Sequence, residues 1–166
     1  MTTRSLSELL PKEMTQLAVR PLFILLLEVQ PAINVGNTPG VDRRVGVIIG
    51  GRFAGERLRG TVLPGGSDWQ AIRPGDGAWM LDVRIVLKTD DEQIIGMPYR
   101  GMRHGPKEVL DRIARGEVVK ATDYYLRIAP FFETASPKYS WLNNIISVGI
   151  GHRLPEGPVY QVFEVL

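Results

Sequence analysis

Short apolar runs, separated by glycine, proline and polar residues, recur along the whole chain. The densest run covers residues 22–30, ends at Pro31 and predicts a strand buried on both faces. Apolar and polar residues alternate most regularly over residues 79–89, which predicts a strand with one buried face. Further strands are predicted at residues 43–49, 57–63, 93–103, 123–132, 145–153 and 159–165. We therefore expect about eight strands, joined mostly by short turns.

One segment has helical spacing instead. Val109 and Ile113 lie on one apolar stripe, and the residues between and beyond them are mostly charged. Pro106 favours the start of a helix and Gly116 favours its end. The pattern predicts a single amphipathic helix over residues 106–115.

The first residues differ from the rest of the chain. The sequence SLSE at residues 5–8 is typical of a capping box, but Pro11 allows only a short helix near residues 11–18. We expect residues 1–20 to be an N-terminal segment that contains this short helix. Residues 21–166 are expected to form a single β-barrel domain.

Glycine and proline mark the connections between the predicted strands. Residues 34–40 predict a loop, and Gly50, Gly51 and Gly55 predict a hairpin or a bulge. Consecutive antiparallel strands with little helix indicate a barrel or a sandwich. Closure into a barrel pairs the edge strands and can enclose one small ligand. We therefore predict a mainly β protein, a closed antiparallel β-barrel with one or two short helices.

Composition narrows the class of protein. A chain of 166 residues provides one domain with a sizeable core. The net charge is +2, and no basic run with interleaved aromatic residues argues for a nucleic-acid partner. The chain has no cysteine, which excludes disulfides, thiolate metal sites and a cysteine nucleophile. With His104 and His152 as the two histidines, we expect no multi-histidine zinc site and no cofactor.

No segment predicts a membrane location. The N-terminal residues are polar and lack the apolar core of a signal peptide. The most hydrophobic stretch, PLFILLLEV at residues 21–29, is too short to span a bilayer. A cytoplasmic location is therefore the expectation.

The strand WMLDVRIVLKT at residues 79–89 allows two interpretations. Its odd-numbered positions are apolar, and Asp82 and Arg84 share the opposite face because side chains alternate along a strand. In one interpretation the apolar face lines the core and the two charges form a surface ion pair. In the other, the polar face lines a ligand-binding lumen, and a helix or another subunit covers the apolar face.

The segment GTVLPGGSDWQ at residues 60–70 places Asp68 and Trp69 directly after a Pro-Gly-Gly corner. One interpretation is structural: Asp68 caps the turn through backbone N–H groups and Trp69 plugs the end of the barrel. The other is functional: Asp68 accepts hydrogen bonds or acts as a base, and Trp69 closes the pocket or stacks on a planar ligand.

Two aromatic segments supply further candidates. In DYYLRIAPFFET, an extended chain places three side chains on one face: Tyr125, Arg127 and Glu133. In KYSWLNN, an extended chain would also aim three side chains the same way: Tyr139, Trp141 and Asn143. Tyrosine and tryptophan commonly serve as core and interface residues, whereas a buried asparagine needs a hydrogen-bond partner.

Several of these motifs, taken in order, resemble the domain of unknown function 3237 family, also known as uncharacterised protein family 0311. The resemblance rests on GGRFAGERLRGTVLPGGSDWQ, LDVR with LKTDD, YRGMRHGP, YYLR, FFET and YSWLN, and it covers nearly the whole chain from Pro21. It implies a closed antiparallel barrel similar to the allene oxide cyclase and calycin-like barrels, but it implies no reaction. The positions that recur in the family are Gly60, Gly65, Gly66, Asp68, Trp69, Asp82, Arg84, Gly101, Arg103, Tyr125, Arg127, Glu133, Trp141, Leu142 and Asn143.

The resemblance favours the lumen interpretation of the strand at residues 79–89, because a surface ion pair needs no fixed identity. The expected catalytic residues are Asp68, Arg84, Glu133 and Tyr125. The expected ligand-binding residues are Trp69, Asp82, Arg103, Arg127, Tyr139, Trp141 and Asn143.

Two classes of function are compatible with this set. The first is an enzyme that acts on a small, partly apolar molecule by metal-free isomerisation, cyclisation or lyase chemistry. In it, Asp68 or Glu133 moves a proton, and Arg84 or Tyr125 stabilises negative charge. The second is a non-catalytic carrier of a small ligand. We also expect a homo-oligomer, because an apolar strand face left outside the barrel must be covered.

Overall fold

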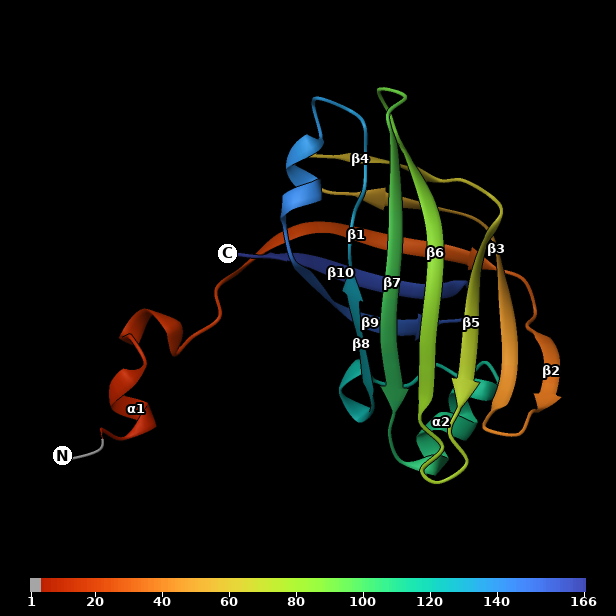
Figure 1. The fold of residues 1–166 in the computed structure, drawn as a ribbon. Coiled ribbons are helices and arrows are strands. Elements are labelled where there is room, and N and C mark those ends of the chain that lie inside the picture. Colours follow the sequence, from red (N-terminus) through yellow and green to blue (C-terminus); the bar gives the residue numbers. More distant parts are fainter. Residues whose placement is uncertain (1–3) are drawn as a thin grey trace.

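The computed structural model describes residues 4–166, and within them the chain forms a β-barrel with a projecting N-terminal arm (Figure 1). The strands are β1 (Val19–Val29), β2 (Ile33–Asn37), β3 (Asp42–Ala54), β4 (Arg59–Val62), β5 (Gly66–Ile72), β6 (Trp79–Thr89), β7 (Ile94–His104), β8 (Tyr125–Pro130), β9 (Ser147–Leu154) and β10 (Gly157–Val165). All of their pairings are antiparallel.

The sheet closes on itself through β1, which pairs with β10 on one side and with β3 on the other. Strands β4 and β5 occupy the same place in the barrel, because both pair with β3 and with β6. The barrel therefore has eight positions, and β2 is an added strand on the edge of β3. The predicted closed antiparallel barrel is confirmed.

The barrel interior is packed with aliphatic and aromatic side chains from every side. Along β6, the odd-numbered residues Leu81, Val83, Ile85 and Leu87 are buried, and the even-numbered side chains between them face outward. Strands β1 and β7 contribute in the same way, with Leu25 and Met97 fully buried. Burial of this apolar surface supplies the main driving force for folding.

The helices are short: α2 lies at one end of the barrel, and α1 lies in the N-terminal arm (Figure 1). They comprise α1 (Leu6–Leu9) and α2 (Lys107–Ala114), with 3₁₀ turns η1 (Lys12–Met14), η2 (Ala121–Asp123) and η3 (Ser140–Asn144). The predicted amphipathic helix corresponds to α2, whose Ile113 is buried. None of the described helices is long and apolar enough to cross a bilayer.

Three local expectations differ from the structure. The predicted loop at residues 34–40 overlaps the strand β2, and an unexpected strand, β5, begins at Gly66, the last residue of the Pro-Gly-Gly corner. Residues 139–143, expected to be extended, instead enter the 3₁₀ turn η3. Each of these segments is short or rich in glycine and asparagine, so pairing with the rest of the barrel decides its conformation.

The N-terminal arm, residues 4–18, projects away from the barrel and buries none of its helical residues (Figure 1). The capping box at SLSE is present, because the Ser5 amide donates a 2.9 Å hydrogen bond to the Glu8 carboxylate. After Pro11, the predicted helix is reduced to the single turn η1. Large apolar side chains of the arm are exposed: Leu6, Leu9, Leu10, Met14 and Leu17.

A glycine at the start of β10 permits closure of the barrel. Gly157 has φ of +148°, and a Cβ atom there would lie 1.9 Å from the backbone oxygen of Leu27 on β1. Both the backbone conformation and the close approach of β1 therefore require glycine. Gly75, in the turn before β6, has nothing within 4 Å of the corresponding position.

We expect Gly157→Ala to lower the free energy of unfolding by at least about 2 kcal/mol, since the added methyl group must push β1 and β10 apart. Gly75→Ala is the matched control and should change it by no more than about 0.5 kcal/mol. Urea titration followed by tryptophan fluorescence measures both values. Equal stability of the two variants would show that the close approach at Gly157 does not constrain closure.

Candidate functional site

The barrel contains a polar cavity near the end that carries α2. This inner cavity has a volume of about 80 Å³, and its apolar walls include Leu27, Val29 and Leu126. Its polar lining consists of Asp68, Gln70, Tyr99, Arg103, Arg153 and Tyr160. A vestibule of about 400 Å³ shares Val29, Gln70, Arg103 and Arg153 with it and is lined further by Arg44, Trp79 and Ile113. Because they share these four residues, the two spaces adjoin each other.

Strand β5 places the carboxylate in this cavity. Asp68 pairs with Gly46 of β3 on one side and with Val83 of β6 on the other, and both of these residues face the interior. Trp69, the next residue, must face the opposite side and is 50% exposed on the outer surface. Gln70 faces inward again, and its amide nitrogen donates a 2.8 Å hydrogen bond to Asp68 Oδ2.

The carboxyl group of Asp68 loses its proton at a higher pH than an exposed aspartate does, because its pKa is raised. Burial raises its pKa to about 6, while the hydrogen bond from Gln70, the backbone N–H of Asp82 and the positive charge of Arg103 all lower it. The second oxygen, Oδ1, is shielded from solvent and has no hydrogen-bond partner among the described residues. An acid of this kind can exchange a proton with a bound molecule near neutral pH.

Two tyrosines stand beside this acid. Tyr99 and Tyr160 are each 3% exposed, and their ring centroids are 5.9 Å apart. Burial raises the pKa of both phenols, so both remain protonated at neutral pH. Protonated phenols can donate hydrogen bonds to an oxygen atom of a molecule in the cavity.

Arginines and a tryptophan form the mouth of the cavity. The guanidinium carbon of Arg103 lies 4.1 Å from the centre of the Trp79 ring, and that of Arg44 lies 5.1 Å from it. Burial lowers the pKa of Arg103, and the nearby charge of Arg153 lowers it further. Arg103 keeps its charge nonetheless, since guanidinium groups do not lose their proton in proteins.

Several polar atoms at this site lack partners. Among the described residues, four shielded side-chain nitrogen or oxygen atoms have no hydrogen bond. Three of them line the vestibule or the inner cavity: Arg44 Nε, Asp68 Oδ1 and Arg103 Nε. Native proteins pair nearly all such atoms with protein groups or with water, so these three atoms are available to a polar molecule that enters either space, water included.

Arg153 is positioned by a small hydrogen-bond network. Its backbone N–H donates to the Tyr124 hydroxyl at 2.6 Å, and that hydroxyl lies 3.0 Å from His152 Nδ1. One terminal nitrogen of its guanidinium group donates to the backbone oxygen of Leu154 at 3.1 Å. These contacts hold the side chain at the rim of the inner cavity.

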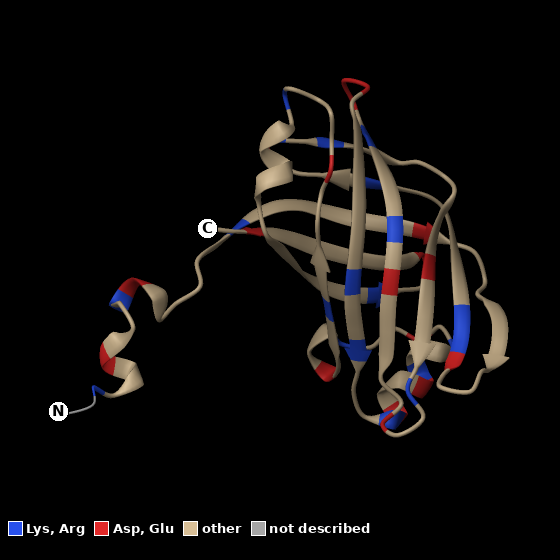
Figure 2. Cartoon of the chain, viewed as in Figure 1, with Lys and Arg blue, Asp and Glu red and all other residues tan. Residues whose placement is uncertain are grey.

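Of the residues expected from the sequence, Asp68 and Arg103 come together in the inner cavity. Asp82 and Arg84 do not join them. The Arg84 side chain is 72% exposed on the outside of the barrel, 3.6 Å from Asp82. Adjacent basic and acidic segments on β6 mark this pair in Figure 2. The expectation that this face lines the lumen is therefore wrong, because the apolar face of β6 fills the core.

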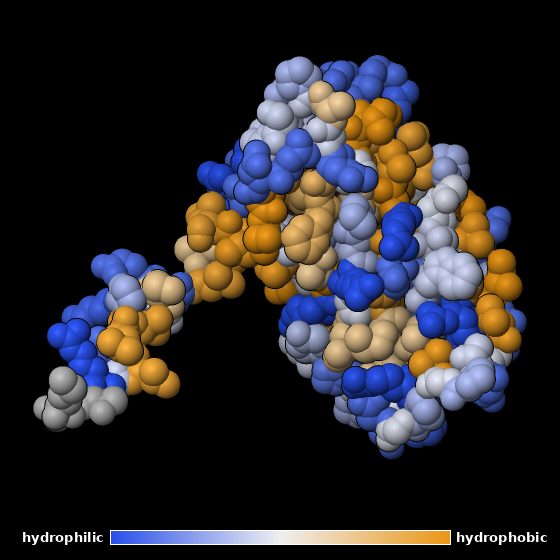
Figure 3. All heavy atoms as spheres, viewed as in Figure 1, coloured by the Kyte–Doolittle hydropathy of each residue, from blue (hydrophilic) through white to orange (hydrophobic). Residues whose placement is uncertain are grey.

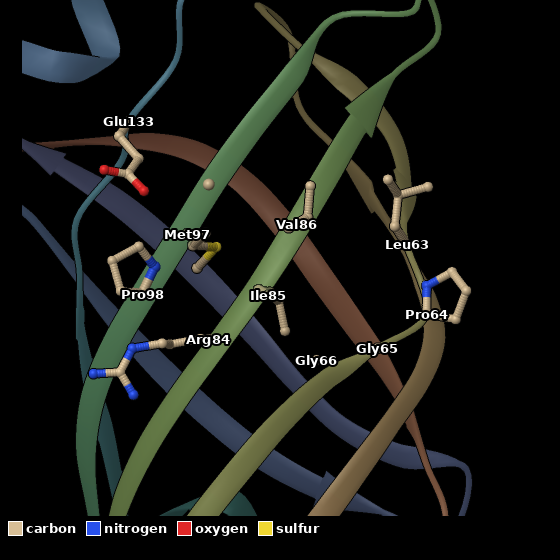
Figure 4. Close-up of a pocket in the computed structure, with 11 residues that line it drawn as sticks. Leu63, Pro64, Gly65, Gly66, Arg84, Ile85, Val86, Met97, Pro98 and Glu133 are labelled. Carbon is tan, nitrogen blue, oxygen red and sulfur yellow. The ribbon is translucent and has the colours of Figure 1, made fainter.

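Glu133 and Arg84 lie on an outer groove of about 350 Å³, with Pro98 between them (Figure 4). The backbone of Glu133 bridges to Gly96 at the edge of β7. Tyr125 and Arg127 also face outward, and the Arg127 guanidinium carbon lies 4.8 Å from the Tyr125 ring centre. The structure therefore separates these four residues from the inner cavity by the barrel wall.

The residues of KYSWLNN lie at the opposite end of the barrel and contact their own surroundings. The Tyr139 hydroxyl donates a 2.9 Å hydrogen bond to Asp91, and Trp141 packs under the Arg57 guanidinium group. Asn143 exchanges two hydrogen bonds with the backbone of Thr134. None of the three lines the inner cavity or the vestibule.

Other residues of the site were missed in the sequence. They are Arg44, Gln70, Trp79, Tyr99, Tyr124, Arg153 and Tyr160. Strand parity could have added two of them, because Tyr99 shares a face with Arg103 and Gln70 shares a face with Asp68. The remainder are brought together by pairing between distant strands. Within residues 4–166, no group of three or more histidine, aspartate or glutamate side chains could hold a metal ion.

A family model described as a protein of unknown function, DUF3237, matches residues 17–165. A relative from Clostridium acetobutylicum, a UPF0311 protein, is 37% identical over 145 residues, covering 87% of this chain and 91% of that relative.

Solved structures show the same architecture. A conserved protein of unknown function from Rhodopseudomonas palustris has a TM-score of 0.87 and 34% identity, covering 91% of this chain and 99% of that one. A beta-barrel like protein from Acinetobacter baumannii has a TM-score of 0.79 and 35% identity, covering 91% and 97%.

The raised pKa of Asp68 predicts a cost in stability. An acid whose pKa rises from 3.8 to about 6 on folding destabilises the protein above pH 6, by about 3 kcal/mol at most, and the cost fades as the pH falls towards 3.8. Asp68→Asn should therefore raise the melting temperature at pH 8, and the gain should shrink steadily as the pH is lowered to 4. Thermal melts followed by circular dichroism measure this difference.

Asp76→Asn serves as the control with the opposite sign. The backbone N–H of Ala78 and the side chain of Arg73 donate hydrogen bonds that lower the pKa of Asp76, so its replacement should lower stability at pH 8. A loss of stability in Asp68→Asn at pH 8 would show that the ionised Asp68 carboxylate does not destabilise the folded protein.

Proposed function

Because the chain belongs to the DUF3237 family of proteins of unknown function, we propose its activity from its own site: proton-transfer catalysis on a small organic molecule bound inside the barrel. The observation that carries the proposal is Asp68 Oδ1, a shielded carboxyl oxygen without a partner beside a polar cavity. The phenols of Tyr99 and Tyr160 and the Arg103 guanidinium group line the same cavity. One small ligand in this cavity can therefore contact the carboxyl group, the two phenols and the guanidinium group.

The chemistry is set by these three kinds of group. The ionised Asp68 carboxylate takes a proton from a C–H bond next to a carbonyl group, and the electron pair moves onto the carbonyl oxygen. The protonated phenols and Arg103 stabilise the resulting enolate oxygen. If the enolate is conjugated with a C=C bond, return of the proton to the far carbon gives an isomer. Addition of the enolate carbon to an electrophilic carbon of the same molecule gives a ring, and departure of a leaving group with its bonding electron pair from the adjacent carbon gives an unsaturated product.

The size and lining of the site favour a small, partly apolar substrate. The vestibule of about 400 Å³ lies within the range of small-molecule pockets. Leu27, Val29 and Leu126 offer apolar walls opposite the polar groups. A carrier needs only an apolar cavity and one polar anchor. A carboxyl group with a pKa of about 6 beside two phenols is instead typical of an acid–base catalyst.

We expect the protein to exchange the acidic C–H protons of small enolisable ketones in D₂O, as measured by proton NMR. The rate should rise with pH through about 6, because the carboxylate form of Asp68 is the base. Asp68→Asn should lower the rate by about 100-fold or more, and Tyr99→Phe should lower it by about 10-fold. Circular dichroism of each variant checks the fold.

Glu133→Gln is the matched control, since Glu133 lies on the outer groove, separated from the inner cavity by the barrel wall, and it should leave the exchange rate unchanged. Ligands that bind without proton exchange would instead support the carrier. An Asp68→Asn variant with the wild-type rate would exclude Asp68 as the base.

We also propose that the protein forms a homo-oligomer. An outer groove of about 690 Å³ crosses β6 to β10, and its exposed apolar residues include Val148 and Ile150. Val19 lines this groove where the N-terminal arm leaves the barrel. Apolar atoms gather both on the arm and on the adjacent barrel surface (Figure 3). Contiguous apolar surface of this kind marks a protein–protein interface.

Light scattering after gel filtration should therefore give a mass that is a multiple of 18.5 kDa. Ile150→Lys should shift the mass towards that of the monomer, because a charge in an apolar interface is costly. Val86→Lys is the control, since Val86 is 39% exposed on β6 but does not line this groove. A monomeric wild type at high concentration would contradict the proposal.

A further inference from the structure

We infer that the substrate carries a carboxylate group, which Arg103 and Arg153 bind where the vestibule meets the inner cavity. Both side chains line both spaces, so an anion held between them sits at the junction. The inference rests on the proposed function, because it names the chemical class of the molecule on which Asp68 acts.

The charges at this junction do not balance. Among the described residues, neither Arg103 nor Arg153 has a carboxylate within 4.0 Å, whereas the described chain contains many other arginine ion pairs. The two guanidinium groups are close enough for the charge of Arg153 to disfavour that of Arg103. Asp68 is the acidic residue of the inner cavity, and one of its oxygens already accepts a hydrogen bond from Gln70. An added anion would relieve this repulsion.

The geometry of Arg103 also suits such a ligand. Trp79 packs against its guanidinium plane at 4.1 Å, which fixes the orientation of the group before any ligand arrives. Its Nε is shielded from solvent and donates no hydrogen bond within the described residues. A fixed planar guanidinium group with available donors matches the two oxygens of a carboxylate.

The small size of the inner cavity favours a carboxylate over a phosphate. The cavity has a volume of about 80 Å³ and holds Asp68 beside Arg103. A planar carboxylate is smaller than a tetrahedral phosphate and fits the fork of a guanidinium group with both of its oxygens. A carboxylate at the junction also leaves the adjoining carbon atoms directed into the inner cavity, where Asp68 and the phenols lie.

Calorimetric titration with benzoate and cinnamate, each compared with its neutral amide, tests the inference. The wild-type protein should bind at least one of these carboxylates about tenfold or more tightly than the matching amide. Arg103→Met and Arg153→Met should each remove most of that preference. Arg103→Lys keeps the charge but loses the planar fork, so it should retain only part of it.

Arg84→Met is the matched control, because Arg84 is exposed on the outside of the barrel, and it should keep the full preference. Asp68→Asn should bind the carboxylate at least as tightly as the wild type, since a like charge is removed. This variant separates the two proposals, because loss of proton exchange with retained carboxylate binding supports both, and unchanged exchange refutes only the role of Asp68.

Equal affinity for acid and amide, or failure of both carboxylates to bind the wild type, would overturn the inference. So would a folded Arg103→Met and Arg153→Met double variant that still prefers the carboxylate tenfold. Inorganic phosphate that competes with the carboxylate at equal concentration would overturn the choice of a carboxylate.

Discussion

Closure of the sheet through β1 is the constraint on which the rest of the structure depends. Because β1 pairs with both β3 and β10, the curved sheet has an inside and an outside, and each strand must assign its two faces accordingly. Apolar faces fill the inside, as β6 shows with Leu81, Val83 and Leu87. Close approach of the backbones at Gly157 permits the contact between β1 and β10 that completes the ring.

The same closure gives a small number of polar residues an unusual environment. Asp68, Tyr99 and Tyr160 lie on inward positions of different strands, near the end of the barrel that α2 covers. There, removal of water raises the pKa of the acid and of both phenols. The fold bears this cost at one place, while most of the remaining interior is apolar.

The outer surface is divided between charged and apolar areas. The ion pair of Asp82 and Arg84 lies on the outward face of β6, where both groups remain hydrated and contribute little to stability. Exposed apolar residues gather instead on the arm and across β8 to β10. The exposed apolar side chains of the arm are one reason why we propose a homo-oligomer.

Local periodicity predicted the strands with regular alternation and the amphipathic helix α2, and it limited the fold to an antiparallel barrel or a sandwich. It also showed that Asp82 and Arg84 share a face. Which side of the barrel that face occupies was decided by the tertiary structure, since alternation is symmetric between the two sides and the apolar residues claimed the interior. The short strand β5 lacks clear alternation, so only its pairing with β3 and β6 sends Asp68 inward and Trp69 outward. Tyr99, Arg103, Arg153 and Tyr160 meet Asp68 for the same reason: strands far apart in sequence are neighbours around a closed ring.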